Sequence, residues 1–93
     1  MSKKRERIVI IHDILKAIQE KGGSAKPTHI LYKSNLSSQM LKDYLQELIT
    51  KKFIEETTDK KKNKYYTITQ KGNKYVQDFT IIKNFMESYD LEE

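Results

Sequence analysis

Hydroxyl, amide and ammonium side chains alternate with apolar residues along residues 37–51, the stretch best suited to binding chemistry. Such groups hydrogen-bond to base edges and phosphates when a helix enters the major groove of DNA. The residues that carry them are Ser37, Ser38, Gln39, Lys42 and Gln46. The pattern predicts a recognition face, and the alternative is the solvated face of an ordinary surface helix.

The polar side chains of this stretch suit different contacts. Gln39 is the best candidate for adenine, because an amide pairs with its N6 and N7 atoms, and Lys42 suits guanine or a phosphate. Ser38 would position the helix on the DNA backbone. Arginine, the commonest reader of guanine, occurs only as Arg5 and Arg7. Base-specific reading is therefore less strongly indicated than binding to the duplex.

A second group of cations surrounds the tip of a predicted hairpin, residues 59–63, where phosphate contact is expected. Its members are Lys60, Lys61, Lys62 and Lys64. The alternative is a solvated loop. Near Thr28, at the start of a short helix predicted from Pro27, exposed backbone amides suit a phosphate, and here the alternative is a solvated helix end.

Apolar residues at helical spacing predict three helices that position these groups. The first runs from Arg7 to Lys21, the second from Pro27 to about Lys33, and the third follows a tight turn at residues 34–36. The third buries one face, made of Met40, Leu41, Tyr44, Leu45, Leu48 and Ile49. A short helix, a tight turn and a longer helix with a polar face predict a helix-turn-helix.

After Lys52 the periodicity changes. Residues 53–58 and 64–69 are rich in aromatic and β-branched residues and predict the two strands of a β-hairpin. A hairpin that follows a helix-turn-helix takes the place of a wing. The predicted fold class is therefore mainly α with a small β-hairpin (α+β), a winged helix-turn-helix over residues 1–69.

A last helix is predicted from Gln70 to about Tyr89, within a segment 70–93 that ends in an acidic tail. Aromatic and aliphatic residues recur along it every three or four positions, at Tyr75, Phe79, Ile82, Phe85, Met86 and Tyr89. Such a seam is buried most simply against its own copy, as in a coiled coil. We expect a homodimer through this helix, antiparallel or crossing, and the alternative is an intrachain helix with a mobile end.

Composition excludes several classes of protein. The chain has no cysteine, and His12 and His29 lack the carboxylate pattern of a metal site. No apolar run is long enough for a membrane span, and the charged start lacks a signal-type segment. No nucleophile with a base partner and no glycine-rich phosphate loop is present, so we expect no enzyme and no cofactor.

Charge is distributed unevenly along the chain. Residues 1–77 hold 17 Lys and Arg against 8 Asp and Glu, whereas residues 78–93 hold one Lys against five acids. The basic part is the candidate for binding a polyanion such as double-stranded DNA. A cytoplasmic, nucleoid-associated location is expected.

Two motifs carry a family resemblance. ILYKSNLS at residues 30–37 and YYTITQKG at residues 65–72 resemble the archaeal ten-kilodalton winged-helix DNA-binding proteins associated with chromatin, and related archaeal regulators, over roughly residues 8–80. The resemblance implies a recognition helix bearing Ser38, Gln39 and Lys42, a wing of lysines 60–64, and an antiparallel coiled-coil dimer without a cofactor. Lys52 departs from the pattern, since such sequences often end the recognition helix with Gly there.

Three functions remain open from the sequence. The first is a transcription regulator that reads a DNA site, and the second is a sequence-tolerant protein that organises chromatin. The third is a winged helix that uses its third helix to bind another protein.

Overall fold

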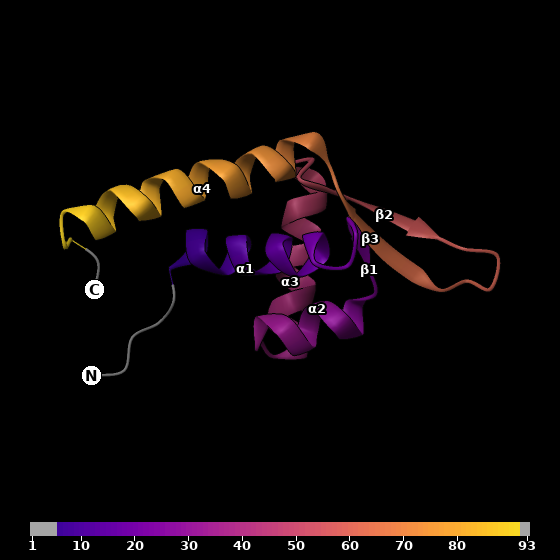
Figure 1. The fold of residues 1–93 in the computed structure, drawn as a ribbon. Helices are drawn as coiled ribbons and strands as arrows, with labels where there is room; N and C mark the ends of the chain where they lie inside the picture. The colour runs from indigo at the N-terminus through magenta and orange to yellow at the C-terminus, as the bar shows by residue number, and fades with distance from the viewer. Residues whose placement is uncertain (1–5, 92–93) are drawn as a thin grey trace.

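Four helices and a small antiparallel sheet make up the structure, a computed structural model that describes residues 6–91. Arg5 and the end of the acidic tail lie outside the described residues. The elements are α1 (Arg7–Gln19), β1 (Ser24–Ala25), α2 (Pro27–Ser34), α3 (Ser38–Thr50), β2 (Ile54–Thr58), β3 (Lys64–Ile68) and α4 (Gln70–Ser88). The hairpin of β2 and β3 projects away from the helices (Figure 1). This arrangement confirms the predicted winged helix-turn-helix.

The sheet has a third strand that the sequence did not predict. β1 pairs with β3, with Ser24 opposite Thr67 and Ala25 opposite Tyr66, so the strand order is β1-β3-β2. A strand of two residues is too short to show an alternating pattern, and its pairing depends on β3 lying alongside it. The predicted hairpin therefore supplies two strands of a three-stranded sheet, with β3 in the centre.

The core lies where α1, α2, α3 and the sheet meet, and α1 supplies its centre. Fully buried apolar side chains are Ile14, Leu15, Ile18, Ile30, Leu48 and Ile54. α3 contributes a narrower face than predicted, because Met40 is 44% exposed while Leu41, Leu45 and Leu48 are buried. Met40 lies about 100° around the helix from Leu41, outside the arc that faces the core.

Side-chain caps begin α3 and α4, as serine and threonine commonly do at helix N-termini. The Ser37 hydroxyl accepts a hydrogen bond from the Met40 amide at 3.1 Å, and the Thr69 hydroxyl accepts one from the Gly72 amide at 3.2 Å. Just after α3, Lys52 adopts a φ of 69°, in the left-handed region that favours glycine. Lys52 therefore adopts the left-handed conformation at the position where the family pattern often has glycine.

α4 begins against the base of the hairpin and then runs along α1 (Figure 1). A Cβ atom on Gly72 would lie 2.5 Å from the Phe53 carbonyl oxygen and 2.6 Å from Ile68 Cγ1. Farther along, the rings of Phe79 and His12 stack with centroids 4.2 Å apart, and Val76 is buried. Val76 and Phe79 therefore belong to the part of α4 that packs onto the core at α1.

Gly72→Ala tests this close approach. We expect the added methyl group to push α4 away from the hairpin base and to lower the free energy of unfolding by about 1–3 kcal/mol, the usual cost of overpacking. Urea denaturation measures the change. Gln77→Ala, an exposed substitution on the same helix, is the control and should stay within about 0.5 kcal/mol of wild type. Equal stability of both variants would contradict the packing described.

Candidate nucleic-acid interface

An open groove of about 350 Å³ lies between α2, α3 and the inner face of the hairpin. We call it the α3 groove. Its lining residues are Pro27, Thr28, Leu31, Ser38, Leu41, Lys42, Leu45, Gln46, Ile49, Glu56, Lys64 and Tyr66. Its lining is mostly apolar, while the polar groups come from four separate elements, α2, α3, β2 and β3.

Five of the ten predicted DNA-binding residues line this groove together: Thr28, Ser38, Lys42, Gln46 and Lys64. The other five, Ser37, Gln39, Lys60, Lys61 and Lys62, are exposed but are not among the lining residues. The structure thus brings the polar face of α3 and the first residue of β3 to one surface.

Two of the predicted α3 contacts have intrachain partners. Ser37 uses its hydroxyl to cap α3, and the Gln39 amide donates to the Asp43 carboxylate at 3.1 Å. Gln39 would have to leave Asp43 before it could bind adenine. Lys42 and Gln46 point into the groove region without such a side-chain partner among residues 6–91.

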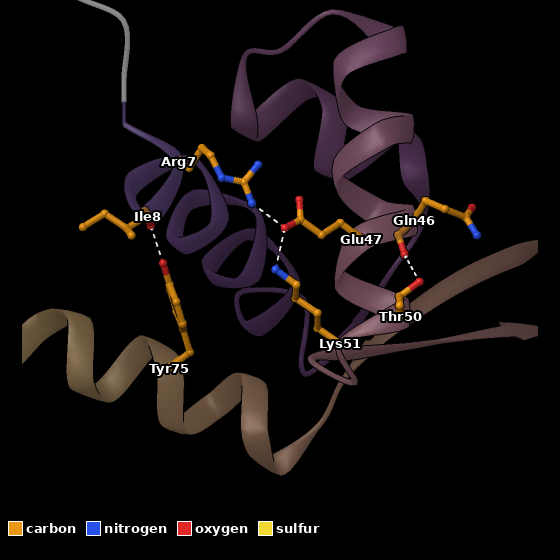
Figure 2. Close-up of polar contacts among 7 residues, drawn as sticks. All are labelled: Arg7, Ile8, Gln46, Glu47, Thr50, Lys51 and Tyr75. Atoms are coloured by element: carbon orange, nitrogen blue, oxygen red, sulfur yellow. Dashed lines mark hydrogen bonds and ion pairs between the residues drawn. The ribbon is translucent and has the colours of Figure 1, made fainter.

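Ion pairs of Glu47 join the flank of α3 to α1. Glu47 receives hydrogen bonds from Arg7 on α1 and from Lys51, whose Nζ atom lies 2.9 Å from Glu47 Oε2. Figure 2 shows Glu47 directed toward α1 and the neighbouring Gln46 side chain directed away from it. The buried leucines turn the polar face of α3 outward, and the exposed ion pair is consistent with that rotation.

A hydrogen bond also joins α4 to the start of α1. The Tyr75 hydroxyl donates to the Ile8 carbonyl oxygen at 2.6 Å (Figure 2). Burial raises the pKa of Tyr75 above its ordinary value. α1, which carries Arg7, is therefore held between α3 and α4.

Glu56 is a charged residue of the α3 groove that sequence reasoning missed. Its Oε2 atom lies 3.1 Å from Lys64 Nζ and accepts a hydrogen bond from the Tyr66 hydroxyl at 3.3 Å. The carboxylate raises the pKa of Lys64, and burial raises that of Tyr66. Glu56 stands opposite Tyr66 in the β2–β3 register, so strand alternation would have placed it on this face.

The hairpin tip is an ordered turn around Asp59. The Asp59 carboxylate accepts hydrogen bonds from the amides of Lys61 at 2.9 Å and Asn63 at 2.8 Å, and the Asn63 bond is the main reason its pKa is lowered. Lys62 adopts a φ of 64°. Within residues 6–91, Lys60, Lys61 and Lys62 are exposed and form no ion pair, so their charges remain available.

The predicted dimerisation residues of α4 fall into two groups. Tyr75 and Phe79 contact α1 within the chain, whereas Ile82 is 54%, Phe85 57% and Tyr89 65% exposed. Met86 is partly buried. Ile81 and Leu91 are also exposed apolar residues here, and the periodicity analysis did not include them.

The described part of the chain has neither a metal-binding cluster nor a membrane-spanning helix. No group of three or more His, Asp or Glu residues within it is arranged to hold a metal ion. None of its helices is long and apolar enough to cross a lipid bilayer.

The model of a winged helix-turn-helix family matches residues 4–87. An uncharacterised protein of the archaeon Methanocaldococcus jannaschii is 38% identical over 71 residues, which are 76% of this chain and 30% of that protein. The chain thus spans less than a third of the length of this relative.

Solved structures with the same fold include two DNA-related proteins. Sso10a-2, a DNA-binding protein from Sulfolobus solfataricus, aligns over 92% of this chain and 90% of its own, with 22% identity and a TM-score of 0.75. MepR, a transcription regulator of the Staphylococcus aureus multidrug efflux pump MepA, aligns over 86% of this chain and 60% of its own, with 23% identity and a TM-score of 0.74. The predicted resemblance to archaeal winged-helix proteins is confirmed.

The Glu47 ion pair makes stability depend on pH. Arg7 and Lys51 hold the pKa of Glu47 below its ordinary value of 4.5. The ion pair therefore adds to the free energy of unfolding above that value, and this stabilisation is lost as the pH falls through the folded-state pKa. We expect Glu47→Gln to lower Tm by a few degrees at neutral pH, and the difference from wild type to vanish in acid. Thermal melts across the pH range measure this.

Glu55→Gln is the control for Glu47→Gln, because Glu55 is exposed on β2 and forms no ion pair among residues 6–91. It should melt with the wild type at every pH. A Glu47→Gln difference that persists unchanged below the pKa of the carboxylate would show that the side chain acts by packing and not by charge.

Proposed function

We propose that this chain, which belongs to the winged helix-turn-helix family, binds double-stranded DNA and inserts α3 into a major groove. The observation that carries the proposal is the α3 groove, where Thr28, Ser38, Lys42, Gln46 and Lys64 converge from three elements. Hydroxyl, amide and ammonium groups at the edge of an exposed helix match the acceptors of base edges and phosphates.

Each group takes a role that follows from its position. Lys42 and Gln46, in the middle of the exposed face of α3, approach base edges, and an amide such as that of Gln46 pairs with adenine. Thr28 and Ser38, at the N-terminal ends of α2 and α3, contact phosphates, which helix N-termini attract. Gln39 also approaches adenine once its side-chain amide no longer donates to the Asp43 carboxylate.

The wing adds contacts that do not depend on sequence. Lys60, Lys61 and Lys62 project from a turn whose shape is fixed by Asp59. They grip the flanking backbone or the adjacent minor groove, and each neutralised phosphate releases counterions, so binding weakens as salt rises.

Transcription regulation is the use of DNA binding that we favour, because Lys42 and Gln46 offer base-reading groups on α3. A second use is supported by the absence of arginine from α3, since arginine is the commonest reader of guanine. A protein that coats DNA with little sequence preference needs only the backbone contacts. The alignment with Sso10a-2 over nearly the whole of both chains suits either use.

Dimerisation through α4 completes the proposal. The C-terminal half of α4 extends past the start of α1 (Figure 1), and its apolar residues Ile82, Phe85 and Tyr89 lie exposed there. A second copy of the same helix buries such a stripe, antiparallel or crossing. In this arrangement residues 1–69 carry the DNA-binding surface and residues 70–93 the dimer contact, so half-sites are about one helical turn apart or a multiple of it.

Lys42→Ala tests the DNA-binding proposal. We expect it to weaken binding to duplex DNA by about 1–3 kcal/mol if Lys42 reads a base, measured by fluorescence anisotropy at fixed salt. Lys16→Ala removes the same charge from an exposed position on α1 outside the groove and serves as control. Equal loss in both variants would contradict a contact at α3.

Selection of bound duplexes from a random pool at two salt concentrations separates the functions. A sharp motif that disappears with Lys42→Ala supports a regulator. A flat profile with strong salt dependence supports the DNA-coating protein. Absence of duplex binding at low salt would overturn the proposal and leave the protein-binding winged helix.

Phe85→Asp tests the dimer. Wild type should sediment as a dimer at micromolar concentration, and the buried carboxylate should shift the variant to monomer while Tm of the winged-helix core changes little. Asn84→Asp adds the same charge at the adjacent exposed position and should remain dimeric. A monomeric wild type at tens of micromolar, or a dimeric Phe85→Asp, would refute this interface.

A further inference from the structure

A second open groove, of about 530 Å³, lies on the other side of the hairpin base and is not used by the contacts proposed above. We call it the β1 groove, because the edge strand β1 contributes Ser24 and Ala25 to it. Its remaining lining residues are Lys21, Lys26, Thr28, His29, Tyr32 and Tyr65. They come from the α1–β1 turn, the start of α2 and the outer face of β3.

Two lysines give the β1 groove its charge. Lys26 places its Nζ atom 5.9 Å from the centroid of the Tyr65 ring, within the range of a cation–π contact. Lys21 is exposed in the α1–β1 turn and forms no ion pair among residues 6–91.

The two grooves differ in how their charge is balanced. In the α3 groove, Glu56 pairs with Lys64 at 3.1 Å. No acidic residue is among the described residues that line the β1 groove. An anion entering it therefore meets two ammonium groups without the repulsion of a lining carboxylate.

Thr28 belongs to both grooves, so the surfaces are continuous across the start of α2. Strand alternation explains the division: Tyr66 faces the α3 groove, while its neighbour Tyr65 faces the β1 groove. The two grooves therefore lie on opposite faces of β3. A ligand that occupies both must be long and polyanionic.

We propose that the β1 groove binds backbone phosphates of the same DNA duplex that enters the α3 groove, with Lys21 and Lys26 as the phosphate ligands. Tyr32, 82% exposed on α2, adds a phenol donor at the rim. This inference rests on the proposed function and extends its footprint from the α3 side of the wing to the opposite side. None of these three residues was among the contacts predicted from the sequence.

The continuity at Thr28 favours DNA over a small anion as the occupant. A duplex carries one phosphate about every 3.4 Å along each strand, so a backbone held at Thr28 continues with further phosphates on either side. The groove is open and the lysines are exposed, which suits a solvated backbone better than an enclosed ligand. These contacts carry no base information and add affinity alone.

The test is the salt dependence of duplex binding for Lys21→Ala, Lys26→Ala and the double variant. Each lost phosphate contact lowers the slope of log K against log salt by about 0.9, so the double variant should lose about 1.8. The preferred duplex sequence should stay the same. Lys16→Ala is the matched charge control, and thermal melts of each variant confirm that the fold is intact.

Hydroxyl-radical footprinting locates the contact. Wild type should protect sugars beside those protected by the α3 groove, and the double variant should lose only the added protection. If both lysine variants keep the slope and footprint of Lys16→Ala, the inference is wrong although DNA binding stands, and the groove has no role with the duplex. If wild type binds no duplex, the proposed function itself fails.

Discussion

The rotation of α3 about its own axis is the constraint on which the rest of the surface depends. Leu41, Leu45 and Leu48 point into the core, and Glu47 is tied to Arg7 on α1 from the side. Once these contacts are made, the helical period places Lys42 and Gln46 on the side that faces solvent. Tyr44 and Ile49 also pack partly against the core, so the apolar face of α3 decides which part of the helix is left outward for polar groups, and the exposed Arg7–Glu47 pair adds little to that choice.

Elements with strong local signals were predictable, and those set by pairing in space were not. The helices, the Ser37 and Thr69 caps and the hairpin follow from periodicity and capping chemistry within short stretches of chain. β1 depends on a partner more than forty residues away, so two residues alone give no signal. Met40 was placed in the core because the pattern gives the centre of an apolar stripe more reliably than its edges.

The interface was predicted in outline, but its charge balance was not. Lysines were identifiable as cations from the sequence, yet the pairing of Lys64 with Glu56 and the link between Gln39 and Asp43 require coordinates. The same holds for the β1 groove, whose members come from three separate elements. Exposed pairs of this kind are weak, so Lys64 and Gln39 can leave their intrachain partners and bind DNA at small energetic cost.

One measurement tests the central claim most directly: amide chemical shifts of isotopically labelled protein titrated with a short duplex. The account predicts that shifts concentrate on the N-terminal ends of α2 and α3, the outward face of α3 around Lys42 and Gln46, and the hairpin from Glu56 to Lys64. Shifts confined to α4, or to the Arg7 and Glu47 side of α3, would contradict it, because that surface faces away from the proposed DNA.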